Sequence, residues 1–565
     1  MGKRFSRKTN AMFKVAALAM LVGGMGSAEA FRVDSSSDWD IRFDNSVQYT
    51  MGWRMQERNA AIANHFAYQA GDAKFDKGDM VTNRIQDLIE AQAVYQGTMG
   101  VRVSASIWKD FAYNDNAKIN SIYAGSFGNP YTGGKYNDYT KRYFLQGGEF
   151  LDAFVFLNTE LSGTPVYFKG GRLSQYWGNA FFFGFSNIAY SQQPIDYIKG
   201  FSQPGSEVKE LFLPRKQILL AADLSQELSV AAQYFFEYRP NRYPESGTYL
   251  GFFDPLFDGP DNFTGSPGVL PRGSHGIVKP KDNNGNWGLK VSWSPEWAGG
   301  DLGFYYRQFD EVDPWLAQLS ATDFRMQSPV NQKAKLFGVS YERTFGLIST
   351  GFELSQRRHT ALNSTPFNAL ALGGEAAKGK ITNFIANTFI QLGTTPVWDS
   401  GILLAEISYT RLNQVTDNEG MYFGEGYIAC QSTAAPYSAT GQANTWRDGC
   451  STKQSLAFAT LFSPQWLQVW PGVDLEAPFS YTWGVKGNPA YRASGFYGEG
   501  TSIYSIGIKA IYQQTTSVSL QYNGYHWRTN TQAGGMYFGN NGFGGIGAVS
   551  LNDRGWLQLQ IKTSF

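Results

Sequence analysis

The feature that most constrains the fold is a rhythm of alternating segments that runs through almost the whole chain. Apolar and polar residues alternate within each segment, which places them on opposite faces of a β-strand. Most segments are paired across a short turn, and long polar connections separate the pairs. The segments are 39–50, 84–96, 99–112, 151–161, 165–173, 216–224, 228–238, 286–294, 301–309, 334–344, 347–356, 381–392, 396–410, 453–462, 467–482, 502–513, 516–526 and 554–565. Roughly 18 strands with alternating short and long connections predict an all-β fold, a transmembrane antiparallel β-barrel with long outer loops.

The last segment, 554–565, has the two-faced pattern of a strand between lipid and water. Leu557, Leu559 and Ile561 fall on an apolar face that suits lipid. Gln558, Gln560 and Lys562 fall on the opposite, polar face that suits a wet lumen. The segment resembles the closing strand of bacterial outer-membrane barrels. That resemblance implies recognition by the barrel-assembly machinery through the terminal Phe565. The last strand of a soluble sandwich is the alternative, and the regular loop rhythm disfavours it.

The first 30 residues have the pattern of a secretory signal peptide. A basic leader precedes an apolar run over 15–25, and Ala28-Glu29-Ala30 fits a small-x-small cleavage site. The apolar run is too short to span a membrane as a helix. We therefore expect residues 1–30 to be removed and residues 31–565 to form one barrel in a Gram-negative outer membrane, in contact with its lipids.

Composition excludes one class of partner and predicts one covalent link. Forty-eight Lys and Arg balance 47 Asp and Glu, which gives no reason to expect nucleic acid. Cys430 and Cys450 are the two cysteines, and a close pair in an exported chain predicts a disulfide, with two free thiols as the alternative. Aromatic residues reach 16%. Candidates for an aromatic girdle at the membrane boundary are Trp39, Trp53, Trp108, Tyr238, Tyr341, Trp466, Trp470 and Tyr512.

One connection, residues 171–215, does not alternate and is unusually apolar for an outer loop. An exposed run of this kind would be adhesive, so we expect it to fold inward as a plug or to pack on other loops. The segment resembles a family of large Gram-negative outer-membrane proteins catalogued as domain of unknown function 1302. The matching residues are Gly171-Arg172, Trp177-Gly178, Asn187-Ile188, Pro194-Ile195-Asp196, the run 204–210, and Leu213-Pro214. Asn179 stands where the family usually has an acidic residue.

The resemblance implies an outer-membrane location and association with a partner outer-membrane protein and with inner-membrane exporters of the resistance–nodulation–division type. It also implies that hydrophobic compounds, such as lipids or sterols, are the molecules handled. The family resemblance does not supply a molecular activity.

Two transport hypotheses follow. In the first, residues 172–215 form a hatch inside the lumen that lets a hydrophobic or amphiphilic small molecule pass, because a half-apolar loop offers an apolar path. Its aromatic contacts would be Trp177, Phe181, Phe183 and Phe185, and its ion pairs would come from Arg172, Asp196, Glu207, Lys209, Glu210 and Arg215. The alternative for the aromatics is that they simply pack outer loops together.

The second hypothesis is a substrate-selective aqueous porin for small nutrients such as organic acids. Roughly 18 strands enclose enough space for water. Candidate lumen charges have mixed signs, which does not predict strong anion selectivity: Arg102, Asp223, Glu237, Glu342, Glu353, Lys509 and Lys562. A surface adhesin or receptor barrel is a third possibility. We expect no enzyme, metal or cofactor, because His65, His275, His359 and His526 sit in no recognisable catalytic or ligand spacing.

Overall fold

The computed structural model contains a closed antiparallel barrel of 18 strands, with one short extra strand beside it. It describes residues 31–33, 38–65, 68–121, 131–203, 211–254, 274–282, 285–314, 318–319, 326–364, 375–434, 443, 445–491, 497–532, 535–537 and 549–565. The barrel closes where the first long strand pairs with the last, from Ser46 opposite Ser564 to Arg54 opposite Trp556. Closure removes the free sheet edges that a bilayer cannot hydrate.

Each barrel strand pairs with its neighbours in chain order. The strands are β2 (Trp39–Arg54), β3 (Met80–Tyr95), β4 (Met99–Asp110), β5 (Gln146–Leu161), β6 (Thr164–Leu173), β7 (Arg215–Asp223), β8 (Leu228–Phe235), β10 (Asn286–Trp293), β11 (Asp301–Phe309), β14 (Ala334–Phe345), β15 (Ile348–Ala361), β16 (Lys378–Leu392), β17 (Ser400–Asp417), β18 (Gln454–Trp470), β19 with β20 (Val473–Glu476 and Phe479–Lys486), β21 (Ser502–Tyr512), β22 (Thr516–His526) and β25 (Trp556–Ser564). The fold class predicted from the alternating rhythm is therefore confirmed.

Several strands extend a few residues beyond their predicted bounds, as β17 does to Asp417, and one predicted turn is misplaced. The sequence pattern ends a strand at 462 and starts the next at 467, but β18 runs on to Trp470 and turns at Gly472, which has a φ of +74°. Pro464 lies inside β18, and Pro478 separates β19 from β20. A proline in mid-strand is the usual mark of a strand end, which is why the pattern was misread.

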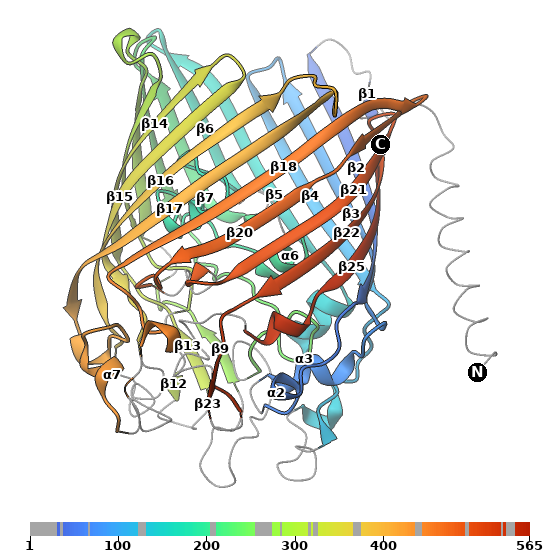
Figure 1. The fold of residues 1–565 in the computed structure, drawn as a ribbon. Coiled ribbons are helices and arrows are strands. Elements are labelled where there is room, and N and C mark those ends of the chain that lie inside the picture. The colour runs from blue at the N-terminus through green and yellow to red at the C-terminus, as the bar shows by residue number, and fades with distance from the viewer. Residues whose placement is uncertain are drawn as a thin grey trace.

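Short turns and long connections lie at opposite ends of the barrel (Figure 1). β1 (Phe31–Val33) and the C-terminus lie at the end with the short turns. In bacterial barrels, the end that carries the short turns and the termini faces the periplasm. The opposite end, called here the loop end, carries most of the short helices and the small strands. These are α2 (Ala60–Ala63), α3 (Gln69–Lys74), α5 (Asp138–Thr140), α7 (Ile428–Gln431), η1 (Thr132–Gly134), η2 (Lys141–Leu145), η6 (Glu419–Met421), η7 (Trp446–Asp448), η10 (Val549–Asp553), β9 (Ser274–Val278), β12 (Gln318–Leu319), β13 (Met326–Pro329), β23 (Asn530–Gln532) and β24 (Gly535–Tyr537). η5 (Glu296–Ala298) lies instead in the short connection between β10 and β11.

The barrel wall has an apolar outer face and a more polar inner face. On β14, Phe337 and Val339 are exposed on the outside, whereas Leu336, Gly338 and Ser340 are buried inside. The aromatic girdle is partly wrong. Trp39, Trp470 and Tyr512 are exposed, but Trp108 and Tyr238 are buried, with Trp108 donating from Nε1 to Arg142 O at 2.9 Å and Tyr238 donating to Glu311 O at 2.9 Å.

The predicted disulfide is confirmed, because Cys430 and Cys450 are bonded to each other. Both are fully buried beside Phe423, and the bond ties α7 to the segment that leads into β18. Among the helices of the described residues, none has the length and apolarity to cross a bilayer.

Candidate functional site

The connection between β6 and β7 enters the barrel instead of covering it. Residues 174–203, called here the plug, contain η3 (Gly184–Ser186) and α6 (Tyr197–Ser202). Figure 1 shows α6 behind the wall strands, within the outline of the barrel. Trp177, Phe183 and Ile188 are at most 2% exposed, so this stretch is as buried as a protein core. The inward-folding plug expected from the apolar character of the sequence is therefore present.

Two wall carboxylates hold the backbone of the plug. Glu353 on β15 accepts hydrogen bonds from the backbone N–H groups of Asn179 at 2.6 Å, Ala180 at 3.0 Å and Ile188 at 3.3 Å. Both oxygens of Glu353 take part, and the side chain is 1% exposed. Because a carboxylate in the ionised form is an acceptor only, a ring of N–H donors suits its charge.

Glu406 on β17 does the same for the next residues. Its carboxylate accepts from the backbone N–H groups of Phe181 at 2.6 Å, Phe182 at 3.0 Å and Phe183 at 2.5 Å. Asn387 on β16 adds a fourth donor to Glu406 at 3.3 Å and also donates to Asn179 O at 2.9 Å. Five consecutive backbone N–H groups, 179–183, thus end on two wall side chains.

Gly178 makes this docking possible. Its φ is +95°, a conformation that favours glycine, and a Cβ there would collide with Glu353 Oε1. On the wall, Gly338 of β14 leaves the space that Ile188 fills, because a Cβ there would meet the Ile188 side chain. In the Trp177-Gly178 pair of the family motif, the glycine therefore allows the plug backbone to approach Glu353.

Two buried wall arginines bind carbonyl groups at the other side of the plug. Arg307 on β11 donates from Nη1 to Ile188 O and Tyr190 O, both at 2.8 Å. Arg215 on β7 donates from Nη2 to Gln192 O at 2.7 Å, and its guanidinium lies 3.9 Å from the centre of the Phe235 ring. Carboxylates therefore hold plug N–H groups, and guanidinium groups hold plug carbonyls.

A third buried arginine, Arg357 on β15, is held differently. Its guanidinium lies 3.7 Å from the Tyr190 ring and 4.1 Å from the Tyr491 ring. The side chain is 0% exposed, yet none of its three nitrogens donates a hydrogen bond to any described residue. Arg215 and Arg307 also keep nitrogens without such a partner.

A second connection packs on the plug from the loop end. Arg242, between β8 and β9, forms ion pairs with Asp196 and with Glu149, both at 2.7 Å. Tyr243 stacks on Tyr197 of α6 with ring centroids 4.9 Å apart. Asp196 also caps α6, accepting from the Lys199 N–H at 3.1 Å.

Buried charges tie this second connection to the rest of the loop end. Arg554, just before β25, donates to Tyr249 O at 2.7 Å and to Gly251 O at 2.6 Å. Arg54, at the end of β2, forms a 2.8 Å ion pair with Asp72. Both arginine side chains and Asp72 are fully buried, so residues 54–65, 68–75, 241–254 and 549–556 form one packed cap.

Burial perturbs two acids at the loop end, Glu311 after β11 and Asp254 in the cap. Burial raises the pKa of Glu311 to about 7, although Thr360 Oγ1 and the Ala361 N–H donate to its carboxylate. Burial also raises the pKa of Asp254 to about 6, against the donors Ala70 N–H and Ser246 Oγ. Both groups lie outside the membrane-spanning strands and take up protons in the mildly acidic range.

The residues predicted for the hatch have different places in the structure. Trp177 contacts Tyr305 of the wall, and Phe183 contacts Tyr497 edge-on. Phe181 is half-buried. The side chain of Phe185 and the residues Glu207, Lys209 and Glu210 lie outside the described part of the chain.

The predicted charged residues are not brought together as one lock. Asp196 pairs with Arg242, and Arg215 binds Gln192 O. Arg172 stands opposite Lys216 in the β6–β7 ladder, on the face that carries the exposed Ile218, and pairs with Glu237 at 3.3 Å. Arg172 therefore lies on the outer face of the barrel and not against the plug.

The sequence pattern predicts Glu353 as a lumen charge but does not connect it with the plug, and it does not distinguish Glu406, Arg307 or Arg357. A signal existed: each is a charged residue on a strand face whose other members are small, polar or apolar and buried. Alternation places such a residue inward, but only the fold shows which inward charges meet residues 179–192.

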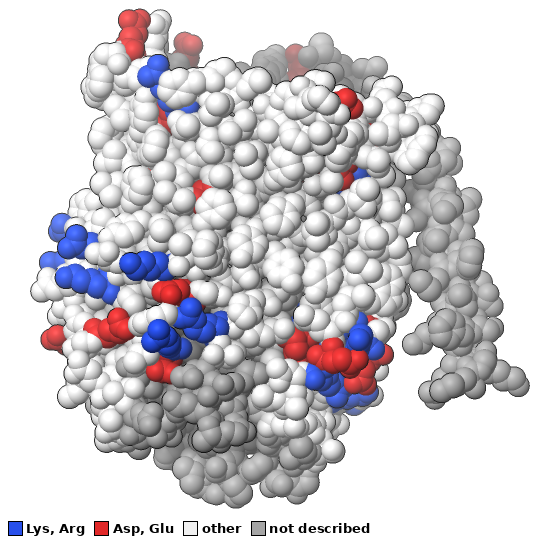
Figure 2. Space-filling view, in the orientation of Figure 1, with Lys and Arg blue, Asp and Glu red and all other residues white. Residues whose placement is uncertain are grey.

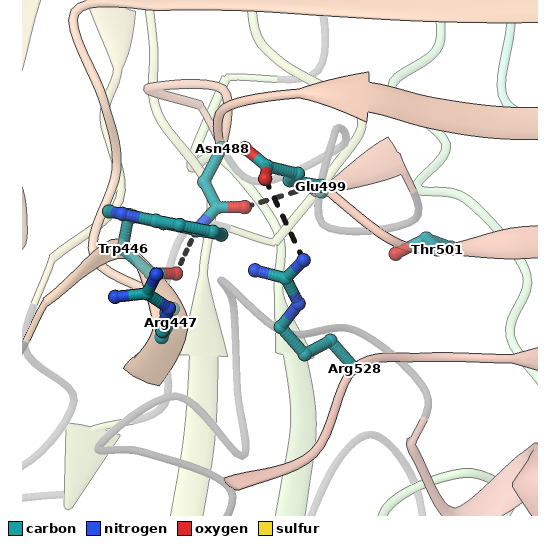
Figure 3. A pocket seen from close by; sticks show the side chains of 8 residues that line it. Trp446, Arg447, Asn488, Glu499, Thr501 and Arg528 are labelled. Atoms are coloured by element: carbon teal, nitrogen blue, oxygen red, sulfur yellow. Dashed lines mark hydrogen bonds and ion pairs between the residues drawn. The ribbon is translucent and has the colours of Figure 1, made fainter.

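A separate small pocket lies at the loop end beside the disulfide-bonded segment (Figure 3). Asn488 donates to Trp446 O at 2.6 Å, Arg528 pairs with Glu499 at 3.6 Å, and the Arg528 guanidinium lies 4.4 Å from the Trp446 ring. With a volume of about 10 Å³, this pocket has room for about one water molecule and not for a solute.

Comparisons with known proteins place the chain in one family. The family described as "Protein of unknown function (DUF1302)" matches residues 11–565. No curated protein matches the chain. Similar solved structures include OccAB4 of Acinetobacter baumannii, with 9% identity, a TM-score of 0.41, and coverage of 94% of this chain and 99% of the other. OccD3 (OpdP) of Pseudomonas aeruginosa has 12% identity, a TM-score of 0.40, and coverage of 96% and 94%.

Proposed function

The chain belongs to the DUF1302 family, and from this premise we propose that it is a plugged outer-membrane channel that admits small polar organic solutes carrying a carboxylate. A closed barrel with an apolar outer face supports a membrane location, and the signal-peptide pattern of residues 1–30 supports export. In the resting state the plug lies across the lumen, and a solute passes when the plug is displaced.

The observation that carries the choice of solute is Arg357. A fully buried guanidinium with three nitrogens that bond to no described residue is costly, because each lost its water on burial. A planar carboxylate is the group that best satisfies a guanidinium, through two parallel hydrogen bonds. Arg215 and Arg307 have further free nitrogens on the same inner wall.

Among the described residues, no acidic group accepts a hydrogen bond from Arg357. Glu353 and Glu406 are surrounded by N–H donors. The Glu311 carboxylate accepts from Thr360 and Ala361 and interacts with Arg357 through charge alone. The lumen therefore carries both signs, so we expect recognition of a carboxylate by local contact and not strong selectivity for all anions.

The hydrophobic-solute hypothesis has weaker support. Trp177, Phe183 and Phe201 are 1–4% exposed, and their rings pack on wall residues or on other loops. Aromatic side chains already used in packing do not offer an apolar path, so the small-nutrient alternative fits the geometry better.

Swelling of proteoliposomes tests the proposal. Solutes matched in size, such as benzoate and its neutral amide, are supplied at equal osmolarity. We expect the carboxylate to enter several-fold faster through the wild-type channel and expect Arg357→Gln to remove that advantage. Arg358→Gln is the matched control, because the adjacent side chain lies on the outer face and should leave it intact. Equal entry of the two solutes, or faster entry of an apolar solute, would refute carboxylate selectivity.

A further inference from the structure

The outer face of the barrel has an apolar hollow that crosses four strands, β10, β11, β14 and β15. The exposed side chains that line it are Leu289, Val291, Phe304, Phe337, Val339 and Leu354, each 36–52% exposed. Gln356 and Thr382 lie at its edge. A concave apolar surface on a membrane-spanning wall fits an acyl chain better than the flat strands around it.

A row of basic side chains lies next to this hollow, toward the loop end. Lys335 of β14 stands opposite Arg358 of β15, and Arg411 of β17 stands opposite Thr382, two residues from Lys380 of β16. Four adjacent strands thus contribute one cation each. Each cation shares its face with outward apolar residues of its strand, as Lys335 does with Phe337 and Val339.

Figure 2 shows Lys and Arg gathered on this side of the molecule, over the loop-side ends of the yellow and orange strands of Figure 1, with a few acidic groups beside them. The nearby acids have other partners, since Glu375 pairs with Lys378 and Asp417 lies 3.7 Å from His359. Within the described residues, none of the four row cations forms an ion pair. Their charges are therefore uncompensated by the protein at a membrane boundary.

The hollow and the row meet at one point. The Arg358 guanidinium lies 5.1 Å from the centre of the Phe337 ring, and its Nε donates to Gln356 Oε1 at 2.7 Å. Phe337 and Gln356 both line the hollow. A molecule with an apolar tail in the hollow would thus place its headgroup among Arg358, Lys335 and Lys380.

We propose that this surface binds a lipid of the outer leaflet whose headgroup carries phosphate, with an acyl chain in the hollow and the phosphate on the basic row. The orientation of the barrel favours the outer leaflet, because the basic row lies toward the loop end and the loop end faces outward in bacterial barrels. Charge complementarity supports phosphate, and the continuity of the apolar hollow with the row supports one amphiphile over a free ion. The site is on the outside of the wall and needs no channel activity.

Native mass spectrometry of the detergent-solubilised full-length protein tests the site. The two probes are a bis-phosphorylated, acylated glucosamine disaccharide and the same lipid without phosphates. We expect retention of the phosphorylated lipid only, and a loss of affinity of roughly tenfold or more when Lys335→Gln and Arg358→Gln remove two charges. The control is Lys109→Gln with Lys216→Gln, two exposed cations on β4 and β7 away from the hollow.

A variant that fills the hollow tests the binding of the acyl chain separately. Val339→Trp fills the hollow without changing charge, and it should weaken binding of the phosphorylated lipid while the fold, followed by heat-modifiable gel mobility, stays intact. Equal binding of both lipids, equal loss in the control pair, or no effect of Val339→Trp would each overturn the proposal. Occupation of the face by a second copy, seen as a lipid-free dimer that Val339→Trp dissociates, would overturn it as well.

Discussion

Replacing Glu406 by glutamine is expected to loosen the plug without removing it. The carboxylate of Glu406 accepts from four donors, the N–H groups of Phe181, Phe182 and Phe183 and the amide of Asn387. Glutamine has nearly the same shape, but one of its two terminal groups is an NH₂ donor. The new NH₂ group replaces one carboxylate oxygen. It then faces either the N–H groups of Phe182 and Phe183 or the N–H of Phe181 and the amide of Asn387, so two hydrogen bonds are lost.

The magnitude follows from these contacts. Hydrogen bonds to a charged group are worth about 1.5–3 kcal/mol each, so losing two of them destabilises the docked plug by at least ~3 kcal/mol. A difference of 1.4 kcal/mol is tenfold in an equilibrium constant, so the displaced state should become roughly a hundredfold more populated. Glu353→Gln should act in the same direction, since Glu353 accepts from three plug N–H groups.

Single-channel recording in planar bilayers measures this population. The wild-type protein should be closed with rare openings, and Glu406→Gln should open far more often at unchanged single-channel conductance. Glu342→Gln is the control, because Glu342 is on β14, faces inward in register with Ser340, and makes none of these bonds. If Glu406→Gln were as quiet as wild type, and the double variant with Glu353→Gln equally so, the carboxylates would not hold the plug.

Three further outcomes are expected. Gly178→Ala should open the channel like Glu406→Gln in the same recordings, because a Cβ at φ +95° collides with Glu353; closed behaviour would contradict this. Joint Cys430→Ser and Cys450→Ser should destabilise the segment they enclose by about 3 kcal/mol in the chain-entropy model, seen as faster proteolysis between them with an intact barrel. Because burial raises the pKa of Glu311 to about 7, its proton stabilises the contact between residues 311–313 and the end of β15 fully below about pH 4.5, and that stability is lost as pH rises through 7. Amide exchange at 311–313, corrected for intrinsic rates, should therefore quicken from pH 5 to 8 in wild type and not in Glu311→Gln.

The barrel was predictable because the residue pattern of each strand depends only on the lipid and the lumen on either side of it. A lipid face and a lumen face impose period two on every segment, as in Phe337 and Val339 against Leu336 and Ser340, and this signal needs no knowledge of partners. The exceptions are places where a side chain serves a distant contact. Trp108 has the character of a girdle residue, but it turns inward to reach Arg142 O.

The plug contacts were only partly predictable for the same reason. The apolar run around Phe181–Phe183 indicated an inward fold, because exposure would be costly. Its anchors are separated from it by 174 residues for Glu353 and 225 for Glu406, and no local pattern encodes that pairing. Residues 241–254 were missed as well, since their packing on Tyr197 and Asp196 depends on how two loops meet.

A reversible tether tests most directly that residues 174–203 close the lumen. Ser186 of the plug and Ser408 of β17 have their Oγ atoms 3.4 Å apart, so cysteines at both positions can form a disulfide across the plug–wall contact. In the Glu406→Gln background, oxidation should abolish openings and reduction should restore them, while the Ser186→Cys variant alone stays unaffected. Openings that persist unchanged in the oxidised, fully cross-linked protein would mean that the plug does not gate the channel.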